Sequence, residues 1–416
     1  MRIVIMAVGG RGDVAPYTGL GLRLREAGHD VAIAAESAHE PLVRSAGLEF
    51  RVLPGNSQAD LDTEDGKRWQ ESGTGVRALV SATRLFTQLM KDLCDGVRGA
   101  AEGADLLLLH HLTIYQGYAV GKAMGIPTMA LELFPTGMAP TGDFPPAELS
   151  LPDLGRWANR NVDRLVGALT SPAVRFFADF QRELGLPGIG LSSMVRALHE
   201  EDWPILHGFS PEVVPRPRDW RPGIEVSGYW WPAVPQGWRP PAELVDFLDA
   251  GPPPVFVGFG SMAQGEGERL SEITAAALRR AGVRGIVQAG WAGMAVAGDD
   301  VFSVGDVPHE WLFPRTAAVV HHGGAGTTGA ALRAGVPAIA APLMADQPFW
   351  ADRLVRLGVS PGSAGLRALD ARRLGELITQ AVTDPRFGDR ARTLAERIRA
   401  EDGAGQVVKA VERLAR

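Results

Sequence analysis

Apolar and polar residues near the start of the chain follow the order expected of a strand, a turn, a helix and a second strand. Residues 3–8 form a continuous apolar run that is short enough for a buried parallel strand. A glycine-rich turn, GGRGD, follows at residues 9–13. Apolar residues then recur at helical spacing over residues 16–27, where Pro16 suits the first turn of a helix. Residues 30–35 complete the unit as a second predicted strand.

The same alternation begins again in the second half of the chain. The predicted strands there are residues 255–259, 284–289, 317–320 and 337–341, the glycine-rich loops are residues 260–267 and 321–326, and one predicted helix is residues 268–281. Repeated strand–helix alternation implies parallel sheets with right-handed crossover connections. The restart near residue 254 therefore predicts a second doubly wound domain.

We expect an α/β fold of two Rossmann-like, doubly wound domains that face each other across a cleft. The first domain is predicted at residues 1–210 and the second at residues 246–400. A proline-rich connector that also contains four tryptophans, residues 211–245, separates them. A C-terminal helix within residues 401–416 is expected to pack back on the first domain. Ligands of such sheets bind at the carboxyl ends of the strands, so the cleft is the predicted active site.

Composition excludes several classes of protein. The 42 lysines and arginines against 48 acidic residues give a net charge of −6, whereas nucleic-acid binding requires a clustered basic surface. Cys94 is the only cysteine, which excludes an internal disulfide and a multi-cysteine metal site and fits a reducing compartment. No apolar run approaches the length of a transmembrane helix, and the first apolar run is too short for a secretory signal. We therefore expect a cytoplasmic protein that is not integral to a membrane, and composition leaves the oligomeric state open.

The glycine-rich segment HHGGAGTT, residues 321–328, predicts a phosphate site. It opens a helix, so free backbone N–H groups and the helix dipole point at the loop. Its small residues let phosphate oxygens approach the backbone, and Thr327 and Thr328 add hydroxyl donors. The alternative interpretation is a glycine-rich connector without a ligand.

Polar side chains on both sides of this segment suggest further contacts. Adjacent residues of a strand face opposite sides, so we expect one histidine of the pair to face the ligand and the other to pack, with no shared metal. Asp346 and Gln347 follow the predicted strand at residues 337–341 and suit a ligand with several hydroxyl groups. They could equally cap the helix that follows.

The first glycine-rich turn does not by itself identify a class of protein. GGRGD does not have the GxGxxG spacing of a dinucleotide-binding oxidoreductase, although Glu36 lies near the distance at which such enzymes carry an acidic residue. The simplest structural interpretation is a tight strand–helix turn with Asp13 near the start of the helix.

Two long segments resemble a known enzyme family. Residues 304–347, VGDVPHEWLFPRTAAVVHHGGAGTTGAALRAGVPAIAAPLMADQ, resemble the donor-binding signature of UDP-glycosyltransferase-like enzymes with the GT-B fold. Residues 1–31 resemble the N-terminus of the same family. One branch of this family has similar sequences at two further places, GYWWP at residues 228–232 and VFVGFGSM at residues 255–262. That branch contains the glycopeptide-antibiotic, vancomycin-type glycosyltransferases and the sterol glucosyltransferases.

This resemblance implies a reaction and a set of residues. The family transfers a sugar, with inversion and without a metal or other cofactor, from a nucleotide diphosphate sugar to an acceptor hydroxyl. The resemblance implies that the first domain binds the acceptor, the second binds a UDP- or dTDP-linked donor, and Asp13 is the general base. His321 matches a histidine that contacts the phosphate. The implied donor-binding residues are Ser261, Val307, His321, Gly323, Gly324, Ala325, Gly326, Thr327, Asp346 and Gln347.

The acceptor is the least constrained part of this prediction. Segments 55–100 and 135–200 interrupt the first domain's alternation, and their aromatic and methionine residues favour a large apolar acceptor such as a natural-product aglycone. The same residues could simply be core. The candidate acceptor-binding residues are Gly10, Arg11, Trp69, Phe86, Phe134 and Met138. The alternatives are a sterol or lipid glucosyltransferase, a GT-B sugar epimerase and a non-catalytic GT-B binding protein.

Two positions depart from the plant members of the family. Asp306 occupies the slot in which plant members carry a tryptophan that stacks on uracil. Plant members also use a histidine base assisted by a distant aspartate, whereas the N-terminal turn supplies Asp13 here.

Overall fold

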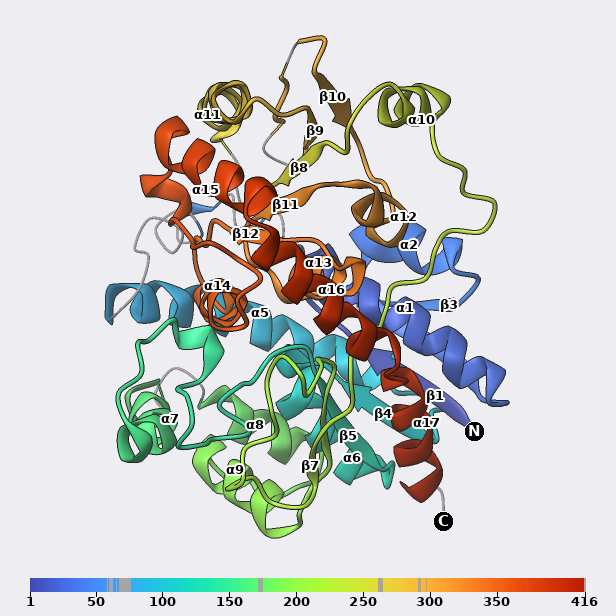
Figure 1. The fold of residues 1–416 in the computed structure, drawn as a ribbon. Helices are drawn as coiled ribbons and strands as arrows, with labels where there is room; N and C mark the ends of the chain where they lie inside the picture. Colours follow the sequence, from blue (N-terminus) through green and yellow to red (C-terminus); the bar gives the residue numbers. More distant parts are fainter. Residues whose placement is uncertain are drawn as a thin grey trace. The chain divides into compact units, whose positions relative to one another are not determined.

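The computed structural model describes most of the chain as two compact units (Figure 1). The described residues are 1–57, 59, 63–64, 66, 76–170, 175–260, 265–290, 293–296 and 298–414, and for 76–86, 163–164 and 166–170 the backbone alone is described. Unit 1 comprises Met1–Pro211, Pro215–Gln236 and Asp402–Arg416, and unit 2 comprises Glu212–Val214 and Gly237–Glu401. The segment predicted as a connector, residues 211–245, is thus divided between the units.

Unit 1 contains a seven-stranded parallel sheet with the order β3-β2-β1-β4-β5-β6-β7. Its strands are β1 (Arg2–Met6), β2 (Asp30–Glu36), β3 (Glu49–Leu53), β4 (Leu106–Leu109), β5 (Thr128–Glu132), β6 (Ile205–His207) and β7 (Ile224–Val226). β1 pairs with β2 on one side and β4 on the other, so Ile5 lies opposite both Ile33 and Leu108. The strand order therefore reverses between β1 and β4, which is where ligands bind in doubly wound sheets.

Helices connect the strands of unit 1 and cover its sheet. They are α1 (Arg11–Glu26), α2 (Glu40–Ser45), α5 (Val76–Ala100), α6 (Ile114–Met124), α7 (Arg156–Thr170), α8 (Phe176–Glu183), α9 (Leu191–Glu200) and α17 (Gly403–Leu414). The C-terminal α17 contacts α1, where an Arg23 Nη2 atom lies 3.2 Å from an Asp402 carboxylate oxygen. No helix in the described part of the chain is both long enough and apolar enough to span a membrane.

Unit 2 contains a five-stranded parallel sheet with the order β10-β9-β8-β11-β12. Its strands are β8 (Val255–Gly258), β9 (Gly285–Gln288), β10 (Val301–Val304), β11 (Ala318–His321) and β12 (Ala338–Ala340). Its helices are α10 (Ala242–Asp249), α11 (Gly267–Ala281), α12 (His309–Leu312), α13 (Ala325–Ala334), α14 (Gln347–Arg356), α15 (Ala371–Thr383) and α16 (Pro385–Arg399). Here the order reverses between β8 and β11.

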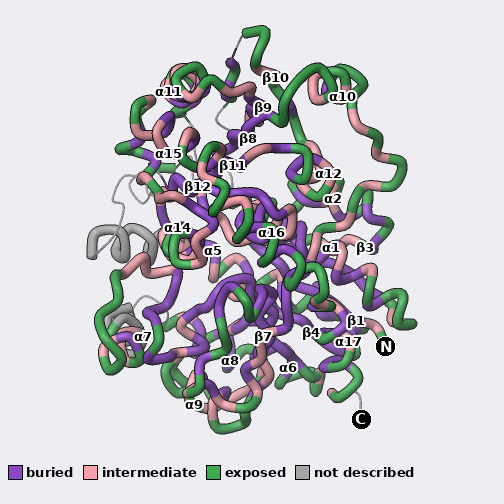
Figure 2. Tube along the Cα trace, in the orientation of Figure 1, coloured by how far each residue is buried: buried purple, intermediate pink, exposed green. Residues whose placement is uncertain are grey.

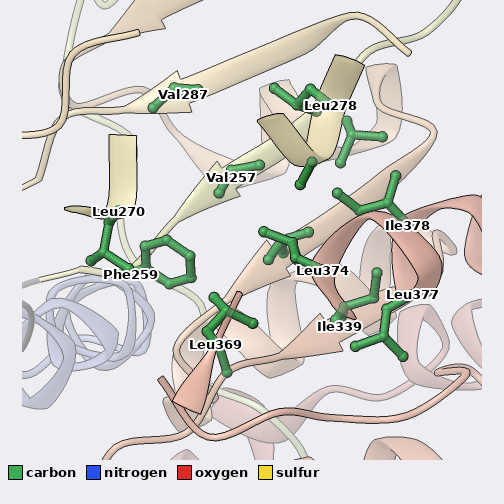
Figure 3. Close-up of a cluster of buried hydrophobic side chains, with 14 of the residues drawn as sticks. Val257, Phe259, Leu270, Leu278, Val287, Ile339, Leu369, Leu374, Leu377 and Ile378 are labelled. Atoms are coloured by element: carbon green, nitrogen blue, oxygen red, sulfur yellow. The ribbon is translucent and has the colours of Figure 1, made fainter. Parts of the chain in front are cut away.

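Apolar side chains from the sheet, α11 and α15 form a core in unit 2 (Figure 3). Val257 and Ile339 of the strands, Leu278 of α11 and Leu374 of α15 are all at most 1% exposed. In Figure 2 the inner strands are buried except at some of their end residues, while the edge strands β3, β7 and β10 are only partly buried. Strands with both faces covered must be continuously apolar, which is why the sequence reveals them as short apolar runs.

The structure corrects two expectations for unit 1. α1 begins at Arg11, so the second half of the predicted turn is the first turn of the helix and Pro16 lies inside it. Gly10 is the N-cap, and Asp13 three residues later accepts its N–H, which allows the helix to start early. α5, within the segment predicted as an insertion, is the crossover helix between β3 and β4 and contacts β3 and α6.

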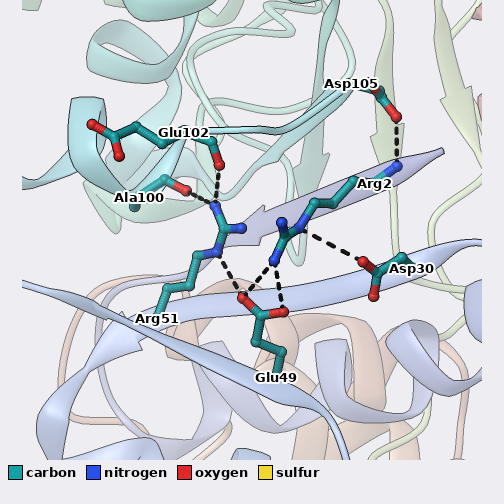
Figure 4. A network of polar contacts seen from close by, with 7 residues as sticks. All are labelled: Arg2, Asp30, Glu49, Arg51, Ala100, Glu102 and Asp105. Carbon is teal, nitrogen blue, oxygen red and sulfur yellow. Dashed lines mark hydrogen bonds and ion pairs between the residues drawn. The ribbon is translucent and has the colours of Figure 1, made fainter.

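A polar network holds the amino-terminal edge of the sheet in unit 1 (Figure 4). It joins Arg2, Asp30, Glu49, Arg51, Ala100, Glu102 and Asp105. Arg2 donates to both carboxylate oxygens of Glu49 at 3.1 and 3.0 Å, and Arg51 donates to the carbonyls of Ala100 and Glu102. Arg2, Asp30 and Glu49 are the first residues of β1, β2 and β3. The network therefore links the amino-terminal ends of these three strands and has a structural role.

We predict that Gly19→Ala destabilises unit 1. A Cβ at Gly19 of α1 would lie 1.9 Å from the carbonyl oxygen of Trp231, and the nearby Ala233 N–H is tied to Thr18 Oγ1 at 2.9 Å. Because backbone must shift, we expect a loss of about 1–3 kcal/mol, measured as a lower melting temperature. Gly99→Ala on α5 is the control, since a Cβ there meets no atom within 4 Å. Equal melting temperatures for both variants would contradict this packing argument.

Candidate active site

Asp13 lies in the first turn of α1, directly after β1. Its Oδ2 accepts the backbone N–H of Gly10 at 2.8 Å, so one carboxylate oxygen closes the turn. Gly9 has φ of +129°, and a Cβ there would lie 2.4 Å from the same oxygen, so only glycine fits this position. His39 fixes the turn further by donating from Nε2 to the Gly9 carbonyl at 2.8 Å. The Asp13 side chain remains 34% exposed, and its second oxygen is not used by the turn.

A histidine pair follows β4, the strand on the other side of the reversal point. The His110 ring is fully buried, and its Nε2 lies 3.7 Å from Asp13 Oδ1. The Tyr17 ring meets it edge-on with ring centres 6.0 Å apart, and the His111 ring lies 4.0 Å from it. Burial lowers the pKa of His111 well below its ordinary value, with a smaller contribution from His110, so His111 is neutral.

Two further polar groups at this edge are neutral for the same physical reason. Burial raises the pKa of Tyr17, and its hydroxyl donates to the carbonyl of Leu131 at 2.8 Å. Glu132 ends β5 and is fully buried. Its burial, with the nearby Glu148 carboxylate, raises the pKa of Glu132 well above the ordinary range. Its Oε1 accepts the Thr136 hydroxyl at 3.2 Å.

The acceptor candidates near Asp13 lie along the same edge. Gly10 and Arg11 form the start of α1 itself. The Phe134 ring lies 5.0 Å from the His111 ring, so a continuous row of ring contacts runs from Phe134 through the histidines to Tyr17. Phe134 is only 7% exposed.

Of the other acceptor candidates, the structure describes the side chain of Met138 alone. Met138 is buried, and its sulfur accepts the Tyr115 hydroxyl at 3.4 Å. Trp69 lies outside the described residues, and for Phe86 the backbone alone is described.

In unit 2, α13 begins directly after the loop that follows β11. Gly324 is its N-cap, and no side chain caps the helix. The first intrahelical bond is made by Thr328, which donates to Gly324, so the N–H groups of Ala325, Gly326 and Thr327 have no partner within the helix. These three amides and the helix dipole lie at the same helix end, which suits an anion.

The structure distinguishes the two histidines of this loop. His321 ends β11, is fully buried, and its Nδ1 accepts the Gly323 N–H at 3.0 Å, so Nε2 carries the proton. His322 is partly buried, and its ring lies beside Gly260 and at the N-cap Gly324, close enough that a Cβ at Gly324 would lie 2.5 Å from its Nε2. Thus the packed ring is His321, and the ring at the helix start is His322.

The same geometry bears on whether the histidine pair holds a metal. Burial lowers the pKa of His321 well below its ordinary value and that of His322 to about 4, so both rings are neutral. The ring centres are 6.3 Å apart and nearly perpendicular. Within the described residues, no group of three or more histidine, cysteine, aspartate or glutamate side chains is arranged to hold a metal.

The loops after β8 and β9 approach this helix start. His322 lies against Gly260, the residue after β8, and a Cβ at Gly290 would lie 2.9 Å from the Gly260 carbonyl oxygen. Glycines therefore let three loops meet closely at the reversal point of the unit 2 sheet. Ser261, the residue predicted to lie beside the diphosphate, lies outside the described residues.

Asp346 and Gln347 occupy the turn between β12 and α14. Asp346 is the N-cap residue of α14, but its side chain makes no capping bond; instead its Oδ2 accepts the Trp350 Nε1–H at 2.7 Å. Gln347 Oε1 accepts the N–H of Leu343 at 2.7 Å, which leaves its amide nitrogen as the side-chain donor. A Cβ at Gly323 would lie 3.0 Å from the Gln347 carbonyl oxygen, so this turn lies beside the histidine loop.

The remaining predicted donor residues lie at the same sheet edge. Val307 is in the loop between β10 and α12 and is partly buried. Thr327 is partly buried in the first turn of α13, while Thr328 is fully buried, so its hydroxyl belongs to the interior of the unit.

Comparison with known proteins identifies the family. Residues 3–108 match the glycosyltransferase family 28 N-terminal domain, and residues 286–414 match the C-terminal domain of erythromycin biosynthesis protein CIII-like enzymes. The chain is 37% identical over 421 residues to the O-mycaminosyltylonolide 6-deoxyallosyltransferase of Streptomyces fradiae, covering 99% of this chain and 97% of that one. The chain belongs to this glycosyltransferase family. It is therefore an enzyme, as the sequence predicted.

More distant similarities agree with the family and fold. A sterol 3-beta-glucosyltransferase of Arabidopsis thaliana is 33% identical over 428 residues, covering 99% of this chain but 65% of the longer relative. A Streptomyces sp. SF2575 glycosyltransferase, solved with thymidine diphosphate, matches with a TM-score of 0.65 at 20% identity and covers 99% of both chains. The two parallel-sheet α/β domains of the GT-B fold are thus confirmed.

The polar groups that follow β4 or end β5 were not predicted from the sequence. His110, His111 and Glu132 each come directly after or at the end of a short buried strand. The signal was present, since LLLL at residues 106–109 is followed at once by two histidines. A polar pair at the end of a four-residue apolar run marks the carboxyl edge of a buried parallel strand.

The neutral His322 predicts a loss of stability in acid. Its folded pKa is about 4, whereas an exposed histidine titrates near 6.5, so the unfolded chain binds more protons between these values. Stability is therefore lost as pH falls from about 6.5 towards 4. In His322→Asn the difference in unfolding free energy between pH 7.5 and pH 5.0 should shrink, on the order of 1–2 kcal/mol. Unchanged pH dependence of the melting temperature in that variant would contradict the burial argument.

Proposed function

We propose that this glycosyltransferase moves a sugar from a UDP- or dTDP-linked donor to a hydroxyl of a large apolar acceptor by direct displacement with inversion. The observation that carries the proposal is Asp13, a carboxylate at the strand-order reversal of unit 1 with one oxygen fixed and the other available. The helix start at the corresponding reversal of unit 2 supports a diphosphate site. Neither feature requires a metal or another cofactor.

The donor diphosphate would lie at the N-terminus of α13. The amides of Ala325, Gly326 and Thr327 would donate to phosphate oxygens, and charge on the leaving diphosphate would strengthen these bonds as the sugar departs. The predicted diphosphate contact was His321. Its burial and its bond to Gly323 favour a loop-shaping role, whereas His322, at the N-cap, is better placed to donate.

The sugar would be held by the turn that precedes α14. Asp346, oriented by Trp350, would accept from sugar hydroxyls, while the Gln347 amide nitrogen would donate to them. Val307 and Ser261 are proposed to complete the nucleotide and diphosphate contacts. A carboxylate that is already oriented loses less conformational entropy when the sugar binds.

Asp13 Oδ1 would take the proton of the acceptor hydroxyl. As this O–H bond breaks, the acceptor oxygen forms a bond to the anomeric carbon of the sugar. The bond from that carbon to the phosphate oxygen breaks at the same time, and the nucleoside diphosphate leaves with the electron pair. Attack from the side opposite the phosphate inverts the anomeric configuration.

We propose a macrolide-like or other natural-product acceptor ahead of a sterol. The chain covers 97% of the macrolide-directed relative at 37% identity, but only 65% of the sterol-directed relative at 33%. Phe134 and Met138 are proposed acceptor contacts with Gly10 and Arg11, as are Trp69 and Phe86. The test is activity with a panel of macrolide aglycones and sterols, each offered UDP- and dTDP-sugars.

We predict that Asp13→Asn lowers kcat by about 10²–10⁴-fold, because general-base catalysis is lost while size is kept. Donor affinity, measured by calorimetry with the nucleoside diphosphate, should change little. Asp30→Asn is the matched control, since Asp30 lies at the opposite edge of the same sheet in the Arg2 network. Near-normal turnover of a folded Asp13→Asn enzyme would reject Asp13 as the base.

We predict that His322→Ala lowers kcat by about 10²–10³-fold, the usual effect of losing one donor to a developing oxyanion. His321→Ala should act mainly through a lower melting temperature, because that ring is buried and shapes the loop. A larger kcat loss in folded His321→Ala would instead support His321, the residue predicted from the sequence, as the diphosphate contact. Treatment with EDTA should leave activity unchanged, and loss that Mg²⁺ restores would contradict metal independence.

A further inference from the structure

Two fully buried polar side chains end neighbouring strands of the unit 1 sheet and take no part in the proposed displacement. Glu132 is the last residue of β5, and His207 is the last residue of β6. The two residues are paired in register across these parallel strands. Residues paired in this way project their side chains from the same face of a sheet, so the carboxyl group and the imidazole leave the sheet side by side.

One oxygen of Glu132 is fixed as a hydrogen-bond acceptor. The Met138 N–H donates to Thr136 Oγ1 at 3.2 Å, and the Thr136 hydroxyl in turn donates to Glu132 Oε1 at 3.2 Å. Burial, with the nearby Glu148 carboxylate, raises the pKa of Glu132 well above its ordinary range, so the carboxyl group is protonated. Because Oε1 accepts, the proton belongs on Oε2. Oε2 is buried and has no hydrogen-bond partner among the described residues.

His207 offers the complementary group. Its Nδ1 lies 3.3 Å from the Glu225 carbonyl oxygen, which can only accept, so Nδ1 carries the proton. Burial lowers the pKa of His207 to about 3, so the ring is neutral and Nε2 presents a lone pair. Within the part of the chain that the structure describes, this Nε2 is buried without a hydrogen-bond partner. The Trp220 ring stacks on the imidazole with ring centres 4.7 Å apart, which holds the imidazole in place.

The segment that follows β5 lies against both groups. Its Thr136 bonds to Glu132. Three residues later, the Ala139 carbonyl accepts the Nε1–H of Trp220 at 2.8 Å, and Trp220 is the ring stacked on His207. The donor on Oε2 and the acceptor on Nε2 therefore lie beneath the same segment. Unpaired buried polar atoms are costly, and a hydroxyl group, which accepts one hydrogen bond and donates another, satisfies both of these at once.

We propose that Glu132 and His207 form a subsite for a hydroxyl group of the acceptor other than the hydroxyl that reacts. The Glu132 Oε2–H donates to the oxygen of this hydroxyl, and the hydroxyl donates to His207 Nε2. The inference rests on the proposed function, because the subsite selects among acceptors of glycosyl transfer. A hydroxyl reaches the pair when the segment after β5 shifts, and that segment carries Phe134 and Met138, two of the proposed acceptor contacts.

The subsite defines a chemical class of acceptor, namely an apolar framework with at least two hydroxyl groups. One hydroxyl reacts beside Asp13, which follows β1, and a second binds at the ends of β5 and β6. Neighbouring strands are spaced at about 4.8 Å, so β5 and β6, two and three strands away from β1, lie about 10–14 Å from it. An acceptor that occupies both places must therefore be large. A macrolide aglycone meets both conditions, whereas a simple sterol carries a single hydroxyl group.

The first test compares Glu132→Gln with Glu132→Met. Glutamine keeps an oxygen that accepts from Thr136 and has an N–H donor in place of Oε2–H, whereas methionine has a similar length and neither group. The substrate is the most active macrolide aglycone of the panel. Glu132→Met should raise its KM about 10–100-fold and keep kcat within about 3-fold, because the contact is made in the ground state and the transition state alike. Glu132→Gln should restore KM to within about 3-fold of the wild-type value.

The second test identifies the hydroxyl. It uses analogues of that aglycone, each with one non-reacting hydroxyl replaced by hydrogen. For one analogue, the wild-type kcat/KM should fall at least about 30-fold, because the buried polar groups are left unpaired. In Glu132→Met, and in His207→Phe, which keeps a ring to stack on Trp220, the aglycone and this analogue should differ by less than about 3-fold. A merely structural role would lower the melting temperature and leave the wild-type ratio unchanged.

Thr128→Val is the matched control. Thr128 begins β5, at the opposite end of the strand from Glu132, and its buried hydroxyl accepts the Trp203 Nε1–H at 2.9 Å. The substitution removes a buried polar group from the same strand but away from the subsite. It should lower the melting temperature while keeping the wild-type acceptor KM and the wild-type discrimination between the aglycone and its analogues.

Three results would reject the subsite. If Glu132→Gln raises KM as far as Glu132→Met, Glu132 acts as a charged carboxylate, as it would towards an acceptor amine. If every analogue keeps the activity of the parent aglycone, the pair holds a buried water only. The same conclusion follows if the wild-type enzyme uses only acceptors with a single hydroxyl. Failure of the proposed function is recognised separately, because the wild-type enzyme would then transfer sugar to no member of the panel, and the subsite would fall with it.

Discussion

A parallel strand that is covered on both faces can carry only apolar side chains, and the chemistry of this protein depends on that constraint. The inner strands of both sheets are buried except at some of their end residues, so polar groups collect where the strands end. Asp13 follows β1, His110 follows β4, Glu132 ends β5 and His321 ends β11. Since all strands are parallel, their carboxyl ends share one edge in each sheet. Within each sheet, these polar side chains are therefore brought to one edge although they are far apart in sequence.

Glycines make the approach of these loops possible. In unit 1, Gly9 lies against the Asp13 carboxylate and takes a backbone conformation that other residues rarely adopt. In unit 2, Gly260 and Gly324 flank the His322 ring. A Cβ at any of these positions would occupy space held by the Asp13 or His322 side chain. The glycine-rich turns thus serve both backbone geometry and side-chain placement.

Burial also determines which groups at these edges are charged. The histidines His111, His321 and His322 are neutral because a buried cation is poorly solvated, and Glu132 is neutral because a buried anion is. Neutral imidazoles can donate or receive a proton without bringing a fixed charge into the site.

The sequence alone determined those features of the protein that depend on a local pattern of residues, namely several strands and the family. The strands around residues 3–8, 30–35, 255–259 and 317–320 were predicted because a short, continuous apolar run is typical of a buried parallel strand, and the family followed from long, nearly contiguous motifs. The start of α1 was predicted at residue 16 but lies at Arg11. The bond from the Gly10 N–H to the Asp13 carboxylate starts the helix early, and the sequence pattern does not show whether this bond forms. Strands β3, β4, β5, β6, β7 and β10 went unpredicted. The edge strands β3, β7 and β10 are only partly buried and lack a continuous apolar run, and β4, β5 and β6 lie among segments that interrupt the regular strand–helix alternation.

Only the tertiary structure decided the relations between side chains. That His110 faces Asp13, that Trp350 orients Asp346, and that His321 rather than His322 is the fully buried ring all depend on strand pairing and loop packing. Because adjacent residues of a strand face opposite sides, the sequence predicts that His321 and His322 differ in burial. Which of the two rings the neighbouring loops cover depends on the tertiary structure. A sequence lists candidate groups at the ends of strands. Distances of a few ångströms between residues about 100 positions apart are determined by how the whole sheet assembles.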